Sequence, residues 1–293
     1  MNYGRIVVLG NGQLGTALAA LSGPAIQVFD RAILDLGDTG AIEPALAAAR
    51  PEVVINAAAY NKVDEAERRP DLAFTINAVA PGAIACACAA IGARIIHVST
   101  DYVFDGALGR PYLEDDLPAP LSVYGASKLA GEHLVRAYAD DRALIVRTSA
   151  VFGTAGPEVG KGGNFVRSIL RQAAAGQPLQ VVNDQTTCPT YAPDLARAIL
   201  SLAARPVSGL LHVTNAGACT WYQFAQAILE LAQLNVPLTP TTSETRPDRA
   251  RRPSYSVLSG ARLAALGITM PPWRDALARY LEEIGAMLDG EVR

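Results

Sequence analysis

The sequence predicts an α/β protein in which a doubly wound parallel sheet carries a small C-terminal cap. Before residue 150, short apolar segments rich in β-branched residues alternate with Ala-rich amphipathic stretches. Strands that helices cover on both faces are almost continuously apolar, which is typical of a parallel sheet. After Phe152 the alternation loosens, and Gly-rich and Pro/Thr/Arg-rich segments follow. We therefore expect residues 1–150 to form the sheet domain, to which later segments return, and residues 151–293 to form mainly the cap.

Five short apolar segments are the strand candidates, and a stretch of helical composition separates most of them from the next. They are residues 5–10, 26–30, 52–57, 94–100 and 143–149. In a sheet of this kind the ligand binds at the carboxyl ends of the strands. Side chains that directly follow these segments are therefore candidate site residues.

Composition narrows the class of protein. The chain has 293 residues and a net charge of −3, which offers no basic surface for a nucleic acid. Charges, Gly or Pro interrupt the apolar stretches, so we expect no membrane span. No secretion signal precedes the first strand candidate, and we expect a cytoplasmic protein. Of the four cysteines, Cys86 and Cys88 lie two apart on a predicted helix and should point to different faces, as small apolar residues.

The first strand candidate ends in a glycine-rich turn. Gly10, Gly12 and Gly15 form a GxGxxG motif, with Gln13 and Leu14 before the last glycine, and a helical stretch follows. The glycines permit a tight turn and a close approach of the backbone to a pyrophosphate, which the helix N-terminus attracts. The motif predicts a dinucleotide site of the Rossmann type, for NADPH or NADH.

The next two strand ends supply further cofactor candidates. Asp30 stands where an acid accepts hydrogen bonds from the ribose of NADH, and Arg31 can pair with the 2′-phosphate of NADPH. Capping of a local turn explains Asp30 equally well, so the choice of cofactor stays open. Ala58, Ala59 and Tyr60 follow the third candidate. The small side chains among them would let the backbone lie against the adenine or a ribose.

A carbonyl-reducing set of side chains is predicted downstream of the glycine turn. Tyr124 and Lys128 lie four residues apart on a helix that should start near Ser122, and therefore share one face. Thr100 ends the fourth strand candidate. Tyr124 would donate a proton to the carbonyl oxygen, and Thr100 would hydrogen-bond the same oxygen. Because a free phenol has a pKa of about 10, we expect the Lys128 ammonium to lower it.

Several longer segments make the chain resemble the dTDP-4-dehydrorhamnose reductase family of extended short-chain dehydrogenases. They run from residue 10 to about residue 277, and the more specific ones are STDYVFDG, YGASKLAGE and NDQTTCPTYAPDLA. The resemblance implies an NAD(P)H-dependent reduction of the 4-keto group of a dTDP-4-dehydro-6-deoxyhexose. The product would be dTDP-L-rhamnose, and residues 151–293 would bind mainly the substrate.

The resemblance also assigns residues by matching position. The catalytic residues would be Thr100, Tyr124 and Lys128, and Thr100 and Asp101 would touch the sugar. The cofactor would be lined by Gly12 to Leu14, Asp30, Asp35, Leu36 and Ala58 to Tyr60. Family members usually have a Trp on the sugar where this chain has Ala150, so the pocket should be roomier. Some bind Mg²⁺ through glutamates, and because Ala17 and Pro193 stand at the matching positions here, we expect no such metal.

Two residues of the C-terminal half are substrate candidates on their own chemistry. Asn164 follows a Gly-rich loop and is either a contact to the nucleotide or a helix N-cap. Arg252 is the preferred member of an arginine-rich segment that also holds Arg246, Arg249 and Arg251. A solvated loop explains such a segment, but a diphosphate would give one or two of these side chains a reason to point inward.

Other residues and functions have plainer explanations. His97, inside an apolar strand candidate, is expected in the core, and Trp273 as a packing anchor at a helix start. A 4,6-dehydratase of the same fold is disfavoured, because Tyr102 replaces the carboxylate that it would need after Asp101. A nucleotide-sugar epimerase and a non-catalytic NADP-binding regulatory subunit remain as alternatives. The expected partner is a dTDP-sugar, and the expected state is a monomer or a homodimer.

Overall fold

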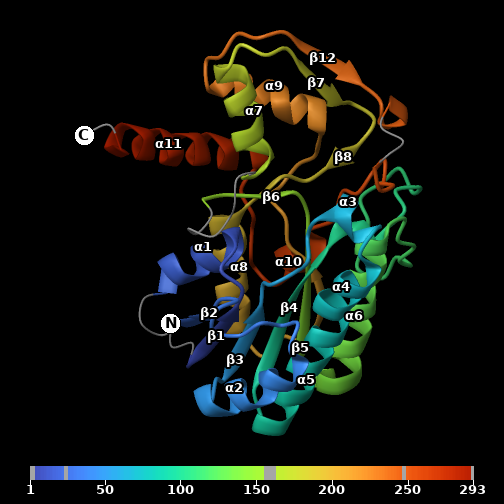
Figure 1. Cartoon of the computed structure of the whole chain (residues 1–293), viewed down its shortest axis with the longest axis vertical. Helices are drawn as coiled ribbons and strands as arrows, with labels where there is room; N and C mark the ends of the chain where they lie inside the picture. Colours follow the sequence, from blue (N-terminus) through green and yellow to red (C-terminus); the bar gives the residue numbers. More distant parts are fainter. Residues whose placement is uncertain (1–3, 23–25, 155–162, 246–248, 292–293) are drawn as a thin grey trace.

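The computed structural model describes residues 4–22, 26–154, 163–245 and 249–291. The chain forms two tiers: a twisted sheet flanked by helices, and a smaller tier above the upper edge of the sheet in Figure 1. The long last helix, α11 (Trp273–Glu291), extends sideways from the junction of the two tiers.

The lower tier contains the predicted parallel sheet. Its six strands lie in the order β10-β5-β4-β3-β1-β2, and every neighbouring pair is parallel. The strands are β1 (Ile6–Leu9), β2 (Ile26–Phe29), β3 (Val53–Asn56), β4 (Arg94–Thr100), β5 (Ala143–Thr148) and β10 (Gly209–His212). The five predicted strands are confirmed to within one residue at each end, and β10 is an addition from the C-terminal half. The strand order reverses between β1 and β3, which makes their carboxyl ends the expected binding crevice.

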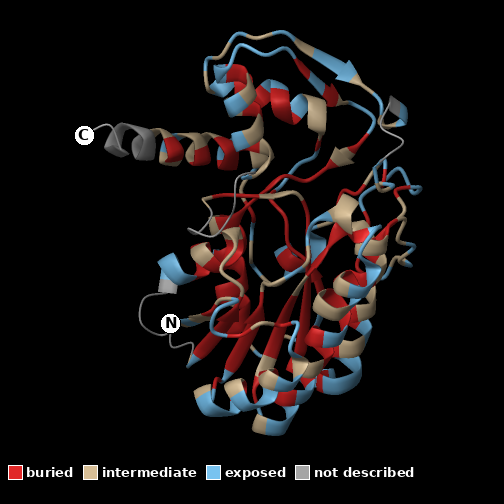
Figure 2. Cartoon of the chain, in the orientation of Figure 1, coloured by how far each residue is buried: buried red, intermediate tan, exposed pale blue. Residues whose placement is uncertain are grey.

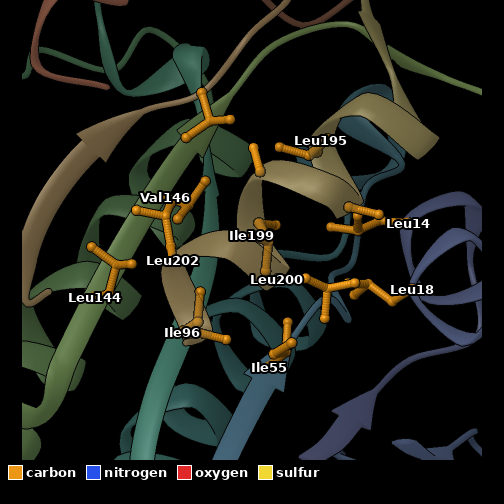
Figure 3. Close-up of a cluster of buried hydrophobic side chains, with 14 of the residues drawn as sticks. Leu14, Leu18, Ile55, Ile96, Leu144, Val146, Leu195, Ile199, Leu200 and Leu202 are labelled. Atoms are coloured by element: carbon orange, nitrogen blue, oxygen red, sulfur yellow. The ribbon is translucent and has the colours of Figure 1, made fainter. Parts of the chain in front are cut away.

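Helices cover both faces of this sheet, so the doubly wound prediction is confirmed. One face packs against α1 (Gln13–Ser22) and α8 (Ala192–Ala203), and the other against α2 (Ile42–Ala49), α5 (Ala80–Ile91) and α6 (Val123–Ala139). Successive strand residues alternate between the two cores, so the inner strands β1, β3 and β5 are buried along their whole length, whereas the edge strand β2 is only partly buried (Figure 2). Figure 3 shows the first core, where Leu14 and Leu18 of α1 meet Ile55, Leu195 and Ile199.

One helical run departs from the expectation that no apolar stretch reaches the length of a bilayer span. Pro70–Ile91 is 22 residues long with a mean hydropathy of 1.8, enough by length and composition to cross a membrane. It comprises α4 (Pro70–Phe74), a π-helical turn η3 (Thr75–Val79) and α5. Half of it is buried inside the protein. Its packing against α2 and α6 is that of a core helix, as Ile84 and Cys88 show.

Cys88 is buried and Cys86 is exposed, which confirms that these two cysteines point to different faces of α5. All four cysteines are free thiols.

The upper tier has a core of its own. Phe152, Tyr191, Phe224 and Tyr280 gather there with ring centroids 5.5 to 5.8 Å apart in several pairs. Trp273 adds an edge-to-face contact to Phe224 at 5.7 Å, as expected of a packing anchor at a helix start. The regular elements are α7 (Phe165–Ala174), α9 (Trp221–Leu231) and the strand pairs β6 (Val151–Phe152) with β9 (Thr190–Tyr191), β7 (Leu179–Val182) with β12 (Leu238–Thr241), and β8 (Thr186–Thr187) with β11 (Cys219–Thr220).

Several short helices connect the longer elements. They are η2 (Thr39–Ala41), α3 (Val63–Ala66), η4 (Asp101–Val103), η5 (Asp140–Arg142), η6 (Ser243–Thr245) and α10 (Ala261–Ala265). Of these, η4 directly follows β4 and α3 lies beyond β3, so both stand at the edge of the sheet where a ligand is expected.

Candidate active site

The glycine turn forms a bare backbone floor between β1 and β3. Gly10 has a φ of +98°, and a Cβ there would lie 2.9 Å from the Cα of Ala58. A Cβ at Gly15 would lie 1.9 Å from the Gly10 carbonyl oxygen, whereas at Gly12 it would meet open space among the described residues. The helix α1 starts at Gln13, so its first free amides face this opening. The floor fits a pyrophosphate at the switch point of the sheet.

The side chains of the turn are engaged within the protein. Gln13 donates to the Val151 carbonyl at 3.4 Å and accepts from Asn164 at 3.1 Å, so it ties the first helix to the upper tier. Leu14 is buried in the core, which leaves its backbone amide as the group that can face a cofactor. Contact of these two residues with a cofactor remains a prediction.

At the far end of the cofactor crevice, the structure shows the turn-capping arrangement of Asp30. Its Oδ1 accepts from the amides of Ala32 and Ile33 at 2.9 and 3.0 Å. Arg31 is exposed and donates two hydrogen bonds to Asp35 at 3.1 and 3.2 Å. The Gly37 amide and Arg31 together hold the pKa of Asp35 below its usual value. Leu36 is buried in the core.

The Ala58–Ala59–Tyr60 segment is held by Asn77, a residue that the sequence did not single out. Asn77 is fully buried in the π-helical turn. It accepts from the Tyr60 amide at 2.7 Å, donates to the Tyr60 carbonyl at 3.0 Å, and donates to Ser127 of α6 at 3.0 Å. An Asn within an apolar helical run was the available signal. π-Helical turns are frequent at functional sites.

The predicted catalytic helix begins where expected. Ser122 caps α6 by accepting from the Gly125 amide at 3.1 Å. Gly125 itself has no room for a side chain, since a Cβ would lie 2.2 Å from the Tyr102 carbonyl oxygen. This close approach holds the first turn of α6, and Tyr124 with it, against the turn that follows β4.

Lys128 is buried beneath the site. Its Nζ donates to the Val98 carbonyl of β4 at 2.7 Å. Burial lowers the pKa of the ammonium to about 8, and the charge of Glu132 opposes that shift. His97, on the same strand, is fully buried, and its Nδ1 lies 3.1 Å from the Asn56 amide nitrogen, as expected of a core histidine. Burial and then the Lys128 charge hold the pKa of His97 well below its usual value.

The expected acidification of Tyr124 is wrong for this structure. Burial raises the pKa of the phenol to about 12, the Asp101 charge adds to the rise, and a hydrogen bond with Thr100 opposes it. Lys128 is not among the groups that shift this pKa. The physical reason is burial, because removing the phenol from water disfavours its charged phenolate form.

Thr100 and Asp101 form a hydrogen-bonded pair at the end of β4. Thr100 accepts from the Tyr102 amide at 3.2 Å and donates to Asp101 Oδ1 at 3.1 Å. Asp101 Oδ2 accepts from Ser149 at 2.7 Å. Burial raises the pKa of Asp101 to about 6, against the lowering effect of hydrogen bonds from Ser256, Ser149 and Thr100.

Two adjacent cavities open at this edge. The smaller, of about 170 Å³, has Thr100, Asp101 and Tyr124 in its wall, and the larger, of about 840 Å³, has Arg252 in its wall. Both are also lined by Tyr102, Gln185 and Trp221. The structure thus brings Thr100, Tyr124 and the preferred arginine to two adjacent cavities, whereas Lys128 is buried and is not one of their lining residues.

The arginine-rich segment lines the larger cavity. Arg249 and Arg251 lie in its wall with Arg252, whereas Arg246 falls outside the described residues. Arg252 is largely buried and donates to Asp64 Oδ1 at 2.9 Å. It also hydrogen-bonds the Tyr102 phenol.

Asn164 takes the N-cap position that was its alternative explanation. Its Oδ1 accepts from the Arg167 amide at 3.0 Å. Its Nδ2 lies within 3.1 Å of acceptors on Gln13, Gly153 and Tyr280. Because these bonds occupy the amide, a contact of Asn164 with substrate stays a prediction that its present bonding does not favour.

Two aromatic residues of the site were not predicted. Tyr102 packs edge-to-face on Tyr124, with centroids 5.8 Å apart and an interplanar angle of 82°. Trp221, the first residue of α9, lies at the junction of the cavities and packs on Phe165 at 4.7 Å. Tyr102 stood inside the STDYVFDG segment, which was the available signal.

Ala150 lines the smaller cavity with an unusual backbone. Its φ is +43°, in a region that costs a residue with a side chain about 1–2 kcal/mol. Because the Ala150 side chain is a single methyl group, it leaves cavity space that a larger side chain would fill. Among the described residues, no group of three or more His, Cys, Asp or Glu side chains is arranged to hold a metal ion.

Known proteins are similar to this chain along most of its length. The profile of the RmlD substrate binding domain matches residues 4–286. The spore coat polysaccharide biosynthesis protein SpsK of Bacillus subtilis is 37% identical over 97% of this chain and 99% of its own length. The dTDP-4-dehydrorhamnose reductase of Mycobacterium tuberculosis is 42% identical over 94% of this chain and 92% of its own.

Solved structures agree. A dTDP-4-dehydrorhamnose reductase from Bacillus anthracis, in complex with NADP, superposes with a TM-score of 0.90 at 37% identity, covering 96% of this chain and 99% of that one. A UDP-glucose 4-epimerase from Thermus thermophilus reaches 0.79 at 23% identity, which shows the shared fold alone. The glycine floor, the Thr–Tyr–Lys set and a match along almost the full length together show that the chain belongs to the RmlD substrate binding domain family.

Proposed function

We propose that this protein is an NAD(P)H-dependent reductase acting on the 4-keto group of a dTDP-4-dehydro-6-deoxyhexose, converting dTDP-4-dehydrorhamnose to dTDP-L-rhamnose. One observation carries the proposal. Tyr124 and Thr100 line a small cavity that shares three wall residues, Tyr102, Gln185 and Trp221, with an arginine-lined one. A sugar carbonyl in the first and a nucleoside diphosphate in the second would fit this pair of spaces.

The cofactor would be held by the floor of the crevice. Gly10, Gly12 and Gly15, with the amides of Gln13 and Leu14, would face the pyrophosphate, and Ala58, Ala59 and Tyr60 the adjoining part of the dinucleotide. Asp30, or the Arg31–Asp35–Leu36 turn, would contact the adenosine ribose. When bound, NADPH or NADH supplies the hydride that the carbonyl carbon takes up.

Tyr124 would supply the proton. As the carbonyl carbon gains a hydride, its oxygen gains negative charge and takes the phenolic proton. A phenol with a pKa of about 12 is fully protonated at neutral pH, so Tyr124 carries the proton that it would donate. Lys128 lies under the same helix face, where its ammonium would face the cofactor ribose.

The larger cavity would bind the rest of the substrate. Arg252, with Arg249 and Arg251 beside it, offers guanidinium groups for the diphosphate. Asp101, at the base of the smaller cavity, would face the sugar. Ala150 leaves room there for a substituent that a larger side chain would exclude.

Purified protein incubated with a reduced nicotinamide and dTDP-4-keto-6-deoxy-L-mannose tests the proposal. We expect sugar-dependent loss of nicotinamide absorbance, and a fall in kcat on the order of 10²- to 10⁴-fold in Tyr124→Phe with unchanged cofactor binding. Interconversion of sugars without net cofactor consumption would indicate an epimerase. Tight NADP binding without turnover on any dTDP-4-keto sugar would indicate a regulatory subunit. In either case the reductase proposal fails.

The setting follows from the same proposal. We place the reaction in the cytoplasm, carried out by a monomer or homodimer without a nucleic acid, a membrane or a metal ion.

A further inference from the structure

Asp101 is a buried carboxyl group held by hydroxyl groups. It is 2% exposed and forms no ion pair among the described residues. Thr100 donates to its Oδ1 at 3.1 Å and Ser149 to its Oδ2 at 2.7 Å. Ser149 in turn lies 2.6 Å from the Thr187 hydroxyl. A buried carboxylate without a cation is costly, so its presence in the wall of the smaller cavity requires a physical explanation.

The hydroxyl network reaches the proton donor of the proposed reaction. Thr100 hydrogen-bonds both Asp101 and the Tyr124 phenol. A hydroxyl group has one proton to donate, and the Thr100 oxygen also accepts from the Tyr102 amide. The direction of the Thr100 proton therefore decides which way the chain from Asp101 to Tyr124 is polarised.

The two protonation states of Asp101 impose opposite directions. An ionised Asp101 is only an acceptor, so Thr100 donates to it and the phenol donates to Thr100, away from the cavity. A protonated Asp101 can donate to Thr100, and Thr100 then donates to the phenol oxygen. In the second state the Tyr124 proton is free to face a carbonyl oxygen in the cavity.

We propose that Asp101 is a positioning residue for carbonyl reduction, whose acid form turns the Thr100 hydroxyl toward Tyr124 and so aims the phenolic proton at the substrate. This inference rests on the reductase function proposed above. The bonds that change are unaltered: the Tyr124 O–H bond breaks and the product O–H bond forms. Asp101 itself keeps its proton during the step.

The groups that face Asp101 determine its titration. Its charge acts on Tyr102, Tyr124 and Cys188, and Arg252 hydrogen-bonds Tyr102. The pKa values of Tyr124 and Cys188 stand at about 12 and 11, so both are neutral near pH 7. Asp101 therefore titrates first, with a pKa of about 6, and a substrate that displaces water from the cavity would raise it further.

The test is the pH dependence of kcat for reduction of the dTDP-4-keto sugar. In the native protein kcat should fall roughly tenfold per pH unit above the Asp101 ionisation. Asp101→Asn places an amide N–H toward Thr100 and an oxygen toward Ser149, which imitates the acid form. In this variant the alkaline decline of kcat should be lost, so that kcat no longer changes across the Asp101 ionisation. Asp115→Asn, which removes an exposed carboxylate outside the cavity, should leave the profile unchanged.

A second variant moves the profile in a predicted direction. Ser149 lowers the pKa of Asp101 by hydrogen bonding, so Ser149→Ala should shift the decline to higher pH. A buried carboxylic-acid band in infrared difference spectra, absent from Asp101→Asn, should titrate with the same midpoint. A folded Asp101→Asn that retains the native decline, or a Ser149→Ala whose decline does not move, overturns the inference while leaving the reductase function intact. Absence of turnover in the native protein overturns the function itself.

Discussion

The buried ion pair behind the site gives a prediction about stability. Glu132 and Arg147 are 2% and 3% exposed and are joined by two hydrogen bonds, of 2.8 and 2.6 Å. Ser99, next to Thr100, donates to the same carboxylate at 2.5 Å. The Arg147 guanidinium also lies 5.0 Å from the centre of the Phe104 ring. Replacing Arg147 with Met fills similar space but leaves the Glu132 charge buried without its cation.

The magnitude follows from that burial. Removing one partner of a buried pair costs about 3–5 kcal/mol, because the remaining charge is left uncompensated in a dry interior. A loss of 1 kcal/mol lowers the midpoint of thermal unfolding by about 2–4 °C in a chain of this size. The thermal midpoint of Arg147→Met should therefore fall by roughly 6–20 °C. The double variant Glu132→Gln, Arg147→Met removes both charges of the pair. It should recover at least half of the lost free energy of unfolding.

Urea unfolding followed by circular dichroism measures both variants. Arg110→Met is the matched control, because Arg110 pairs with Asp116 at 2.8 Å but is about half exposed. Exposed pairs contribute about 0–1 kcal/mol. If Arg147→Met costs no more than Arg110→Met, or the double variant is less stable than the single one, the reasoning from burial is refuted.

Three further predictions concern the glycine floor, acid stability and the sugar cavity. Gly15→Ala should weaken NADPH binding in a fluorescence titration. The added Cβ would lie 1.9 Å from the Gly10 carbonyl oxygen, so the glycine turn would have to move. His212 has a pKa of about 3 in the fold, against 6.5 unperturbed, so the unfolded chain binds its proton first. Stability should therefore fall as the pH drops from 6.5 to about 3, by at most about 5 kcal/mol, and His212→Gln should flatten this slope in acid unfolding. Ala150→Trp should raise KM for the keto sugar more than it lowers kcat, since it fills a cavity of about 170 Å³.

The sheet was predictable because its signal is local. Each of the first five strands is a run of apolar residues that ends at a Gly, Asp, Asn or Thr, and both faces of the sheet are covered. The sixth strand, β10, pairs with β5, which lies more than 60 positions earlier in the chain. No pattern within Gly209–His212 specifies that partner. Its place follows from the whole fold.

The convergence of Thr100 and Tyr124 on one cavity could be predicted from the sequence, whereas the aromatic residues Tyr102 and Trp221 and the bonding within the site could not. Thr100, Tyr124 and Lys128 could be placed at one edge from strand ends and helical spacing. The Lys128 ammonium donates to the backbone carbonyl of Val98. Because every residue has a backbone carbonyl, no side chain in the sequence identifies this acceptor. The same limit applies to Asn164, whose residue type suits a helix cap and a ligand contact equally.

The hydrogen bonds and burial of the site bear on Tyr124 as the proposed proton donor. Burial pushes the phenol of Tyr124 toward a pKa of about 12 and the ammonium of Lys128 toward about 8, so each is moved toward its neutral form. A buried site of this kind disfavours an isolated phenolate. The proton would therefore stay on Tyr124 until the substrate carbonyl oxygen becomes basic. Such a donor suits reduction better than a phenol that is already half ionised. In the proposed reaction, Thr100, which hydrogen-bonds both Tyr124 and Asp101, would determine where the phenolic proton points.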